Sequence, residues 1–216
     1  RSRICEILRG RDVVLIEDDP YGDLRFDGER LPYIGAGALP YSIVLGTFSK
    51  TVTPGMRIGF VISENTKLLK NISIAKEAGD LHTNIFSQYL IWDYLMNNDL
   101  DAHIAKIRAL YKKQEQAMMD AIERYFPPAV RYTRPHGGMF LWVTLPEGVS
   151  AMELFPKALE KKVAFVPGDP FYAHERAEEN AADARCVNTM RLNFTNADCA
   201  AIEEGIRRLG EVLSAL

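Results

Sequence analysis

The stretch GTFSKTVTPGMRIGF, residues 46–60, places a lysine, an arginine and several hydroxyl groups between two apolar runs. The runs SIVLG and IGFVIS lead into it and out of it, and short apolar runs of this kind are typical of strands. The pair Pro54 and Gly55 predicts a turn between the two strands. Polar side chains gathered where two strands converge make this stretch the first candidate for a functional site.

The residues around this stretch predict an α/β arrangement. VVLIEDD (13–19) is an apolar run that ends in acids, which is typical of a buried and parallel strand. SIVLGTFSK (42–50) and RIGFVIS (57–63) provide two more strands, so we expect a thin, mostly parallel sheet with exposed edges, as in a piece of a larger protein. The expected helices are one ending near Gly10, one over 65–79 capped by Asn65 or Thr66, and a more buried one over 84–98.

The second half of the sequence predicts an α+β layer. A long helix from Leu100 to Tyr125 comes first, and the prolines of FPP end it. We place a domain boundary within this helix, which gives domains over 1–112 and 113–216. The later strand-like runs are AVRYTRP (129–135), GGMFLWVTLP (137–146), VAFVPG (163–168) and TMRLNFT (189–195), with helices over 150–162 and 196–216.

Charge and composition narrow the classes of partner. The net charge of −3 gives no electrostatic reason to expect a nucleic acid or an anionic membrane as partner. No apolar run approaches the roughly 20 residues that a membrane-spanning helix needs. The cysteines have no metal-ligand spacing, which favours a reducing, cytoplasmic setting and no metal centre. They are Cys5, Cys186 and Cys199.

Three clusters carry residues suited to chemistry: IEDDPYGDL (16–24), the stretch 46–60, and MRLNF (190–194). Taken singly, each has a structural explanation. An acid can cap the turn before Pro20, a lysine at a strand end can reach solvent, and hydroxyls can satisfy loop backbone. Arg57 and Arg191 can each pair with a structural carboxylate.

The combination of these clusters is more specific than any one of them. Hydroxyls and an arginine can hold a phosphate, and a lysine beside them can condense with an aldehyde. A carboxylate on a neighbouring strand can pair with a protonated pyridine nitrogen. These are the requirements of pyridoxal phosphate, whose ring serves as an electron sink.

The motifs also occur in a familiar order. FSKTVTPGMRIGF, EDDPYGDL, PHGGMFLWVTLP, FVPGDPFY and MRLNFT together resemble the fold-type I pyridoxal-phosphate-dependent aminotransferases of class I/II. The resemblance is strongest to the branch of the 2-aminoadipate, kynurenine and aromatic aminotransferases. It covers nearly the whole chain, which resembles the C-terminal half of such an enzyme: the end of the large cofactor domain and the small C-terminal domain.

The resemblance implies roles for residues in the first domain. Lys50 matches the Schiff-base lysine, and Tyr21 matches the hydroxyl that binds the phenolic oxygen of the cofactor. Asp18 matches the acid on the pyridine nitrogen, because the family places that acid three residues before the tyrosine; this favours Asp18 over Asp19. The expected phosphate ligands are Thr47, Ser49 and Arg57, with Thr47 standing where the family commonly has serine.

The resemblance also implies a substrate site and a reaction. Arg191 matches the arginine that binds the α-carboxylate of the substrate. The expected reaction is ping-pong transamination between an amino acid and a 2-oxo acid, in a cytoplasmic homodimer. The family's phosphate-binding glycine loop, ring-stacking aromatic and phenolic-oxygen asparagine lie in the other half, so we expect the isolated chain to hold the cofactor weakly and to turn over little.

Two alternatives stay open. The same domain can be fused to a winged-helix DNA-binding module, so that it serves a transcription regulator. The cofactor can also serve a different reaction, as in a β-lyase or a decarboxylase. Upstream sequence distinguishes the first alternative, and assays of amino transfer distinguish the second.

Overall fold

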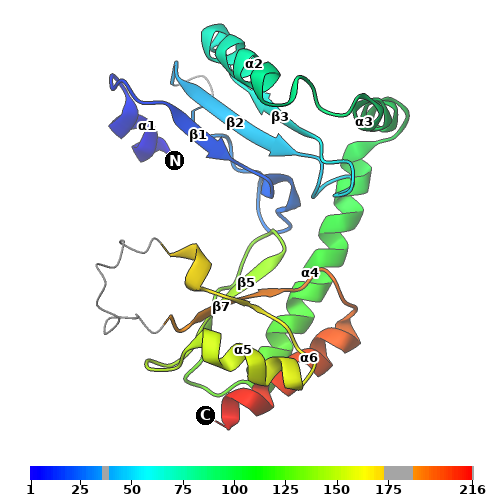
Figure 1. The fold of residues 1–216 in the computed structure, drawn as a ribbon. Helices are drawn as coiled ribbons and strands as arrows, with labels where there is room; N and C mark the ends of the chain where they lie inside the picture. Colours follow the sequence, from blue (N-terminus) through cyan, green and yellow to red (C-terminus); the bar gives the residue numbers. More distant parts are fainter. Residues whose placement is uncertain (36–38, 173–186, 216) are drawn as a thin grey trace. The chain divides into compact units, whose positions relative to one another are not determined.

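The computed structural model describes residues 1–35, 39–172 and 187–215. The chain forms two compact units, Arg1–Ile107 and Arg108–Leu216, and each is described here by itself. The division falls inside helix α4 (Leu100–Tyr125), whose ends are those that the sequence predicts (Figure 1). The assignment of the two halves to a cofactor domain and a small domain remains a prediction.

The first unit contains a three-stranded sheet in the order β1-β2-β3. Strands β1 and β2 are parallel, and β2 and β3 are antiparallel. The strands are β1 (Leu15–Asp18), β2 (Ser42–Thr47) and β3 (Gly59–Ile62).

The antiparallel pairing of β3 corrects the expectation of a mostly parallel sheet. Only Phe48–Ile58 connects β2 to β3, and this connection contains no helix. A parallel pair needs a crossover of a dozen or more residues, which is usually helical. The Phe48 N–H instead donates to the Ile58 carbonyl at 3.0 Å and closes a hairpin-like loop. Because this connection is short and contains no helix, β3 runs antiparallel to β2.

The helices of the first unit begin and end close to the predicted positions. Gly10, with a φ of 74°, follows the end of α1. The Asn65 side chain accepts a hydrogen bond from the Leu68 N–H at 3.0 Å, which confirms Asn65 as the N-cap of α2. The elements are α1 (Ser2–Leu8), the short 3-10 helix η1 (Gly22–Leu24), α2 (Thr66–Asp80) and α3 (Ile85–Asn97).

Two predictions of burial in this unit are wrong. Ile16 on the expected buried strand is 60% exposed, and Trp92 on the expected buried helix α3 is 58% exposed. Within α3 only Ile91 is buried, and α2 has no buried residue. Apolar content predicts burial only where other segments cover the side chain, and the described part of this unit leaves Ile16 and Trp92 uncovered.

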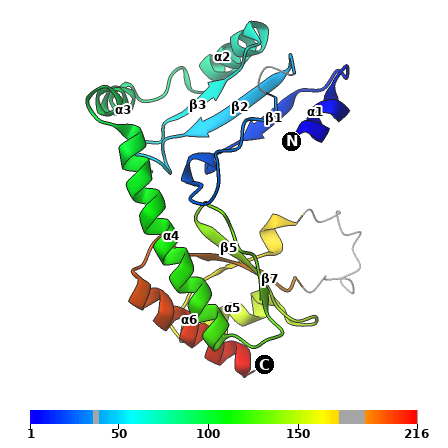
Figure 2. The same ribbon diagram turned by 180° about the vertical axis from the view of Figure 1, so that it is seen from behind.

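The second unit contains a four-stranded sheet in the order β4-β5-β7-β6, antiparallel throughout. This confirms the α+β layer that the sequence predicts for the second half. Helices α5 and α6 pack against each other beside this sheet (Figure 2). The elements are β4 (Arg131–Tyr132), β5 (Phe140–Thr144), α5 (Ala151–Glu160), β6 (Val166–Pro167), the 3-10 helix η2 (Asp169–Phe171), β7 (Thr189–Asn193) and α6 (Cys199–Ser214).

One face of this sheet belongs to the core. Leu141 and Val143 of β5 are fully buried, and Met190 and Leu192 of β7 are buried beside them. These residues alternate with less buried neighbours, as expected for strands with one core face. Helix α6 approaches α4 closely, because a Cβ at Gly210 would collide with the Tyr125 carbonyl. The opposite face of the sheet does not belong to this core.

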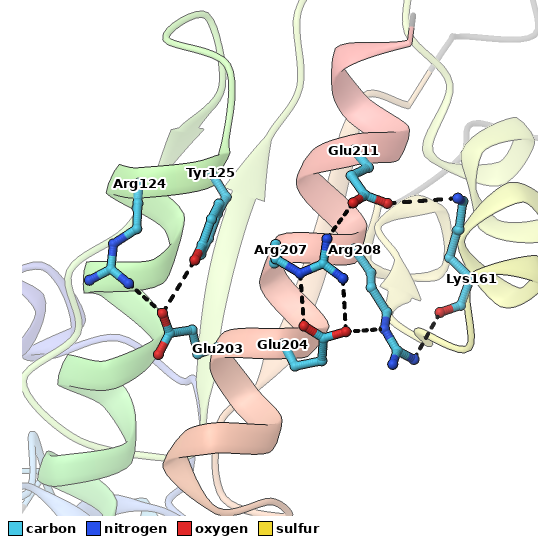
Figure 3. A network of polar contacts seen from close by, with 8 residues as sticks. All are labelled: Arg124, Tyr125, Lys161, Glu203, Glu204, Arg207, Arg208 and Glu211. Atoms are coloured by element: carbon cyan, nitrogen blue, oxygen red, sulfur yellow. Dashed lines mark hydrogen bonds and ion pairs between the residues drawn. The ribbon is translucent and has the colours of Figure 1, made fainter.

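Two groups of polar contacts lie on the surface of the second unit, one between α4 and α6 and the other between α6 and Lys161 (Figure 3). Arg124 forms an ion pair with Glu203. Glu204 accepts hydrogen bonds from the Nε atoms of Arg207 and Arg208, each at 2.8 Å. These contacts place charged side chains along the exposed surface of α6.

Candidate active site

The carboxyl ends of β1 and β2 meet at one edge of the first sheet, because these strands are parallel. Asp18, the last residue of β1, is aligned with Leu45 of β2. The Asp19 N–H donates to the Leu45 carbonyl at 3.0 Å and extends the pairing by one bond. The residues that follow the two strands therefore gather at the edge where α/β sheets bind ligands.

The structure separates the two aspartates of this edge. Asp19 Oδ1 accepts from the Gly22 N–H at 2.7 Å, and a Cβ on Gly22 would collide with that carboxylate. Asp19 therefore caps the turn after β1. The Asp18 side chain is exposed and makes no hydrogen bond within the described residues. The turn-capping explanation fits Asp19 and leaves Asp18 available for a ligand.

Lys50 lies in the turn that follows β2. The Val52 and Thr53 N–H groups both donate to the Phe48 carbonyl, at 2.8 and 3.0 Å, and this tight turn presents Lys50 beside Tyr21. Lys50 Nζ lies 5.9 Å from the centre of the Tyr21 ring. In the part of the chain that the structure describes, no carboxylate pairs with the amine. The amine lies near the Tyr21 ring, and no acid among the described residues neutralises it.

The two hydroxyl groups beside Lys50 have different surroundings. Thr47 Oγ1 accepts from the Ser49 N–H at 3.1 Å and donates to the Ile58 carbonyl at 3.4 Å. Thr47 thus satisfies loop backbone, as its structural explanation proposed. Ser49 Oγ accepts from Arg57 Nη1 at 3.4 Å, so this hydroxyl connects the turn to the arginine.

Arg57 has an unusual backbone conformation, with a φ of 56°. Its Nη1 also donates to the Pro54 carbonyl at 3.2 Å. All the partners of Arg57 that the structure records are neutral oxygens, and within the described ranges no carboxylate pairs with it. Pairing with a structural carboxylate therefore does not explain Arg57.

Aromatic packing holds the strand that leads to this turn. Phe60 of β3 is paired with Gly46 of β2, where a Cβ would collide with the Phe60 ring. The Phe60 ring also lies 5.3 Å from that of Phe48, centre to centre. The glycine lets the ring lie flat on the strand immediately before Thr47. This contact supports the position of the turn that carries Lys50.

Arg191 belongs to the second unit, on strand β7, whereas Lys50 belongs to the first unit. Its Nε is buried and has no hydrogen-bond partner among the described residues. No carboxylate in the described part of the chain pairs with Arg191. A buried donor without an acceptor is uncommon, and it fits an anion-binding role.

Other kinds of site have no support in the described residues. They contain no group of three or more histidine, cysteine or acidic residues placed to hold a metal ion. No helix within the described ranges is both long and apolar enough to cross a membrane. Cys5 is buried and Cys199 is partly buried, while Cys186 lies outside the described residues.

Known proteins match this chain over almost all of its length. The sequence is 42% identical over 214 residues, 99% of the chain, to the aromatic-amino-acid aminotransferase 1 of Thermococcus litoralis, of which it covers 49%. No family model matches the chain.

Solved structures show the same relationship. The fold matches an α-aminoadipate aminotransferase from Thermus thermophilus, complexed with N-(5'-phosphopyridoxyl)-L-leucine, with a TM-score of 0.88 and 39% identity over 99% of this chain and 53% of that one. It matches the kynurenine aminotransferase of Pyrococcus horikoshii, in complex with PMP, with a TM-score of 0.88 and 41% identity over 99% of this chain and 50% of that one.

A weaker match concerns another class of protein. An uncharacterized transcriptional regulator of the HTH type from Bacillus subtilis is 27% identical to the chain, which covers 42% of it. The stronger matches are all to aminotransferases, and the chain spans about half of their length. The chain is thus similar, over almost all of its length, to class I pyridoxal-phosphate-dependent aminotransferases of the 2-aminoadipate, kynurenine and aromatic branch.

Proposed function

We propose that the protein containing this chain is a pyridoxal-phosphate-dependent amino acid:2-oxo acid aminotransferase, and that the chain supplies its C-terminal half. One observation carries the proposal most strongly. An amine, a phenol, two hydroxyls and a guanidinium gather at the edge where β1 and β2 end, and no carboxylate within the described residues neutralises the amine or the guanidinium. The similarity to aminotransferases over 99% of the chain supports it.

The donor set of this edge fits pyridoxal phosphate. Ser49 and Arg57 offer an O–H and several N–H groups to phosphate oxygens, and Thr47 stands beside them. The backbone strain at Arg57 is consistent with this role, because unfavourable φ values persist mainly at functional sites. Asp18 offers an exposed carboxylate that forms no hydrogen bond with any described residue. When bound, the cofactor supplies an electron sink for negative charge that develops on the substrate Cα.

Each residue then has a separate task in our proposal. Lys50 Nζ would hold the cofactor covalently, and its amine would serve as the base that removes and returns protons at the substrate Cα. Asp18 keeps a proton on the pyridine nitrogen by pairing with it. The Tyr21 hydroxyl donates to the phenolic oxygen. Arg191 binds the α-carboxylate, which fixes the orientation of the bond that breaks.

The substrates and the assembly are also proposals. Amino acids and 2-oxo acids are the proposed substrate class, because the matched proteins are named as aminotransferases of amino acids. We propose a homodimer, and the exposed apolar side chains of α3 are consistent with an association surface. The cytoplasmic location also stays a prediction.

Amino transfer by the full-length protein tests the function. The protein, loaded with pyridoxal phosphate, is mixed with 15N-labelled L-2-aminoadipate or L-kynurenine and an unlabelled 2-oxo acid. We expect label in the newly formed amino acid, none with Lys50→Ala, and wild-type transfer with the control Lys67→Ala on α2. Absence of transfer from every common amino acid to any oxo acid, with the cofactor bound, would contradict the proposal.

The match to an HTH-type regulator supports one second candidate, an effector domain that binds the same cofactor. A regulator would bind DNA in a way that depends on pyridoxal phosphate and would transfer no amino group. A lyase would release a 2-oxo acid or an amine without requiring an oxo-acid acceptor. The same labelled reactions, analysed with and without acceptor, therefore separate all three.

A further inference from the structure

Arg191 lies on the face of the second sheet that is turned away from the core. Trp142 of β5 is paired directly with Arg191 of β7, so their side chains share a face. Phe140, two residues before Trp142, lies on that face as well. The buried side chains of Leu141 and Val143 point to the other face. The strand pairing thus places aromatic side chains around the arginine.

Two aromatic rings lie against the guanidinium. Arg191 Cζ is 4.0 Å from the centre of the Phe140 ring and 4.8 Å from the centre of the Phe171 ring. Both distances are within the range of about 6 Å in which a cation is attracted to an aromatic face. Aromatic contacts at the faces of a guanidinium leave its edge, where the N–H groups lie, for hydrogen bonding.

The Phe171 ring is held in place although it is 49% exposed. Trp142 meets it edge to face, with the ring centres 5.3 Å apart. The segment that carries it is fixed against β7, because the Gly168 N–H donates to the Thr189 carbonyl at 2.7 Å. Tyr172 adds a hydrogen bond from Thr189 Oγ1 at 3.3 Å. Phe171 therefore has a defined position from which to restrain Arg191.

We propose that Phe140 and Phe171 are positioning residues for Arg191. Their rings hold the guanidinium before substrate arrives, so that its edge meets the α-carboxylate with two parallel hydrogen bonds. Ordering a long side chain in advance removes part of the entropy cost of binding. The proposal rests on the aminotransferase function and on the carboxylate role of Arg191.

The test compares three variants of the full-length, cofactor-loaded protein. Phe171→Leu keeps apolar volume and removes the aromatic face, whereas Phe171→Tyr keeps the face. Phe155→Leu is the matched control, because Phe155 packs on Phe165, with ring centres 5.3 Å apart, and not on Arg191. Binding of glutarate, a dicarboxylate without an amino group, is measured by calorimetry, and KM and kcat are measured with 2-aminoadipate.

In Phe171→Leu we expect glutarate affinity to fall about tenfold and KM to rise about as much, with kcat changed far less. Phe171→Tyr should restore both values, and Phe155→Leu should leave them at the wild-type level. Equal glutarate affinity in wild type and Phe171→Leu would overturn the proposal. An equal loss in Phe155→Leu would also overturn it, since it would show only general destabilisation.

A spectroscopic measurement keeps this inference separate from the proposed function. Ring currents should shift the Arg191 Nε–H proton resonance of the wild-type protein away from that of a solvated arginine, and the shift should shrink in Phe171→Leu. The signal is identified by its absence in Arg191→Lys. If the protein transfers no amino group but the shift is present, the proposed aminotransferase function is wrong and the positioning of Arg191 by the aromatic rings is still supported. An unshifted wild-type resonance overturns the restraint, whatever the activity.

Discussion

Arg57 adopts a left-handed backbone conformation that few residues other than glycine adopt. This conformation accompanies the contact of its guanidinium with the Ser49 hydroxyl. If Arg57 binds phosphate, Arg57→Ala and Arg57→Gly should both weaken cofactor affinity by about tenfold to a hundredfold, as expected for a hydrogen bond to a charged group. Titration of the full-length apoprotein with pyridoxal phosphate measures the affinity.

Comparing Arg57→Gly with Arg57→Ala separates the effect of backbone strain on stability from the loss of cofactor binding. Glycine tolerates a positive φ, so Arg57→Gly should unfold at a higher temperature than Arg57→Ala. Arg30→Ala is the control, because Arg30 pairs with Asp23 in the same unit and should keep wild-type affinity. Unchanged cofactor affinity in both Arg57 variants would remove Arg57 from the phosphate site.

Arg191 provides a second prediction at the scale of single residues. Arg191→Lys keeps the positive charge but removes the planar pair of donors. We expect KM for amino substrates to rise on the order of a hundredfold, as expected when charged hydrogen bonds are lost. Steady-state kinetics of the full-length protein measures it. An unchanged KM for every amino acid would refute the carboxylate role.

Some of these residue roles were accessible from the sequence, and others were not. Lys50 and Arg57 stand out because charged residues interrupt apolar runs. The choice of Asp18 rested on the family spacing, and the hydrogen bond from Gly22 N–H to Asp19 now gives it a physical reason. The backbone strain at Arg57 and the rings around Arg191 depend on tertiary contacts, so no local pattern could predict them.

Among the elements, helix α2 depends on its cap. Asn65 Oδ1 accepts from the Leu68 N–H, and Asn65 Nδ2 donates to the Pro40 carbonyl at 2.9 Å. Asn65→Ala should cost about 1 kcal/mol of helix stability, so the Leu68 amide should exchange hydrogen about fivefold faster. Asn65→Asp should keep most of the protection, because it keeps the acceptor. Exchange as slow as in wild type for Asn65→Ala would contradict the capping role.

Helix α6 carries a pH-dependent contribution to stability. Hydrogen bonds from Arg207, and to a smaller extent from Arg208, lower the pKa of Glu204 from 4.5 to about 2 (Figure 3). Because the pKa of the folded state lies below that of the unfolded state, this stabilisation is present above about pH 4.5 and is lost as the pH falls toward 2. The contribution is small because the side chains are partly exposed to solvent.

Urea unfolding at pH 6 and pH 3 tests this contribution. Between these two values wild type should lose more stability than Glu204→Gln, which has no titrating carboxyl at this position. Glu160→Gln, an exposed change on α5, should behave as wild type. If Glu204→Gln showed the full wild-type pH dependence, the network would not contribute.

Elements were predicted best where the signal is local. The caps of α2 and the prolines after α4 mark ends that the chain itself determines. The direction of β3 and the exposure of α3 were predicted wrongly, because they depend on the connection to β2 and on what covers the helix. The sequence records apolar content, whereas burial depends on neighbouring layers.

At the scale of the molecule, the chain spans about half the length of the aminotransferases that it resembles. The exposed apolar residues of the first unit, including Ile16 and Trp92, are consistent with a surface that other chain segments cover. We therefore predict that the 216 residues on their own retain pyridoxal phosphate weakly and give little or no turnover. A measurable aminotransferase rate from the isolated chain would contradict this.

The order of five motifs along the sequence predicted the family, and the solved structures confirmed it. The central claim that remains to be tested is that Lys50 carries the cofactor. Borohydride reduction of the full-length, cofactor-loaded protein fixes the cofactor to its lysine, and mass spectrometry of the digest then locates it. We predict a single pyridoxyl adduct on the peptide that contains Lys50. An adduct on another lysine, or none although the cofactor is bound, would contradict the account.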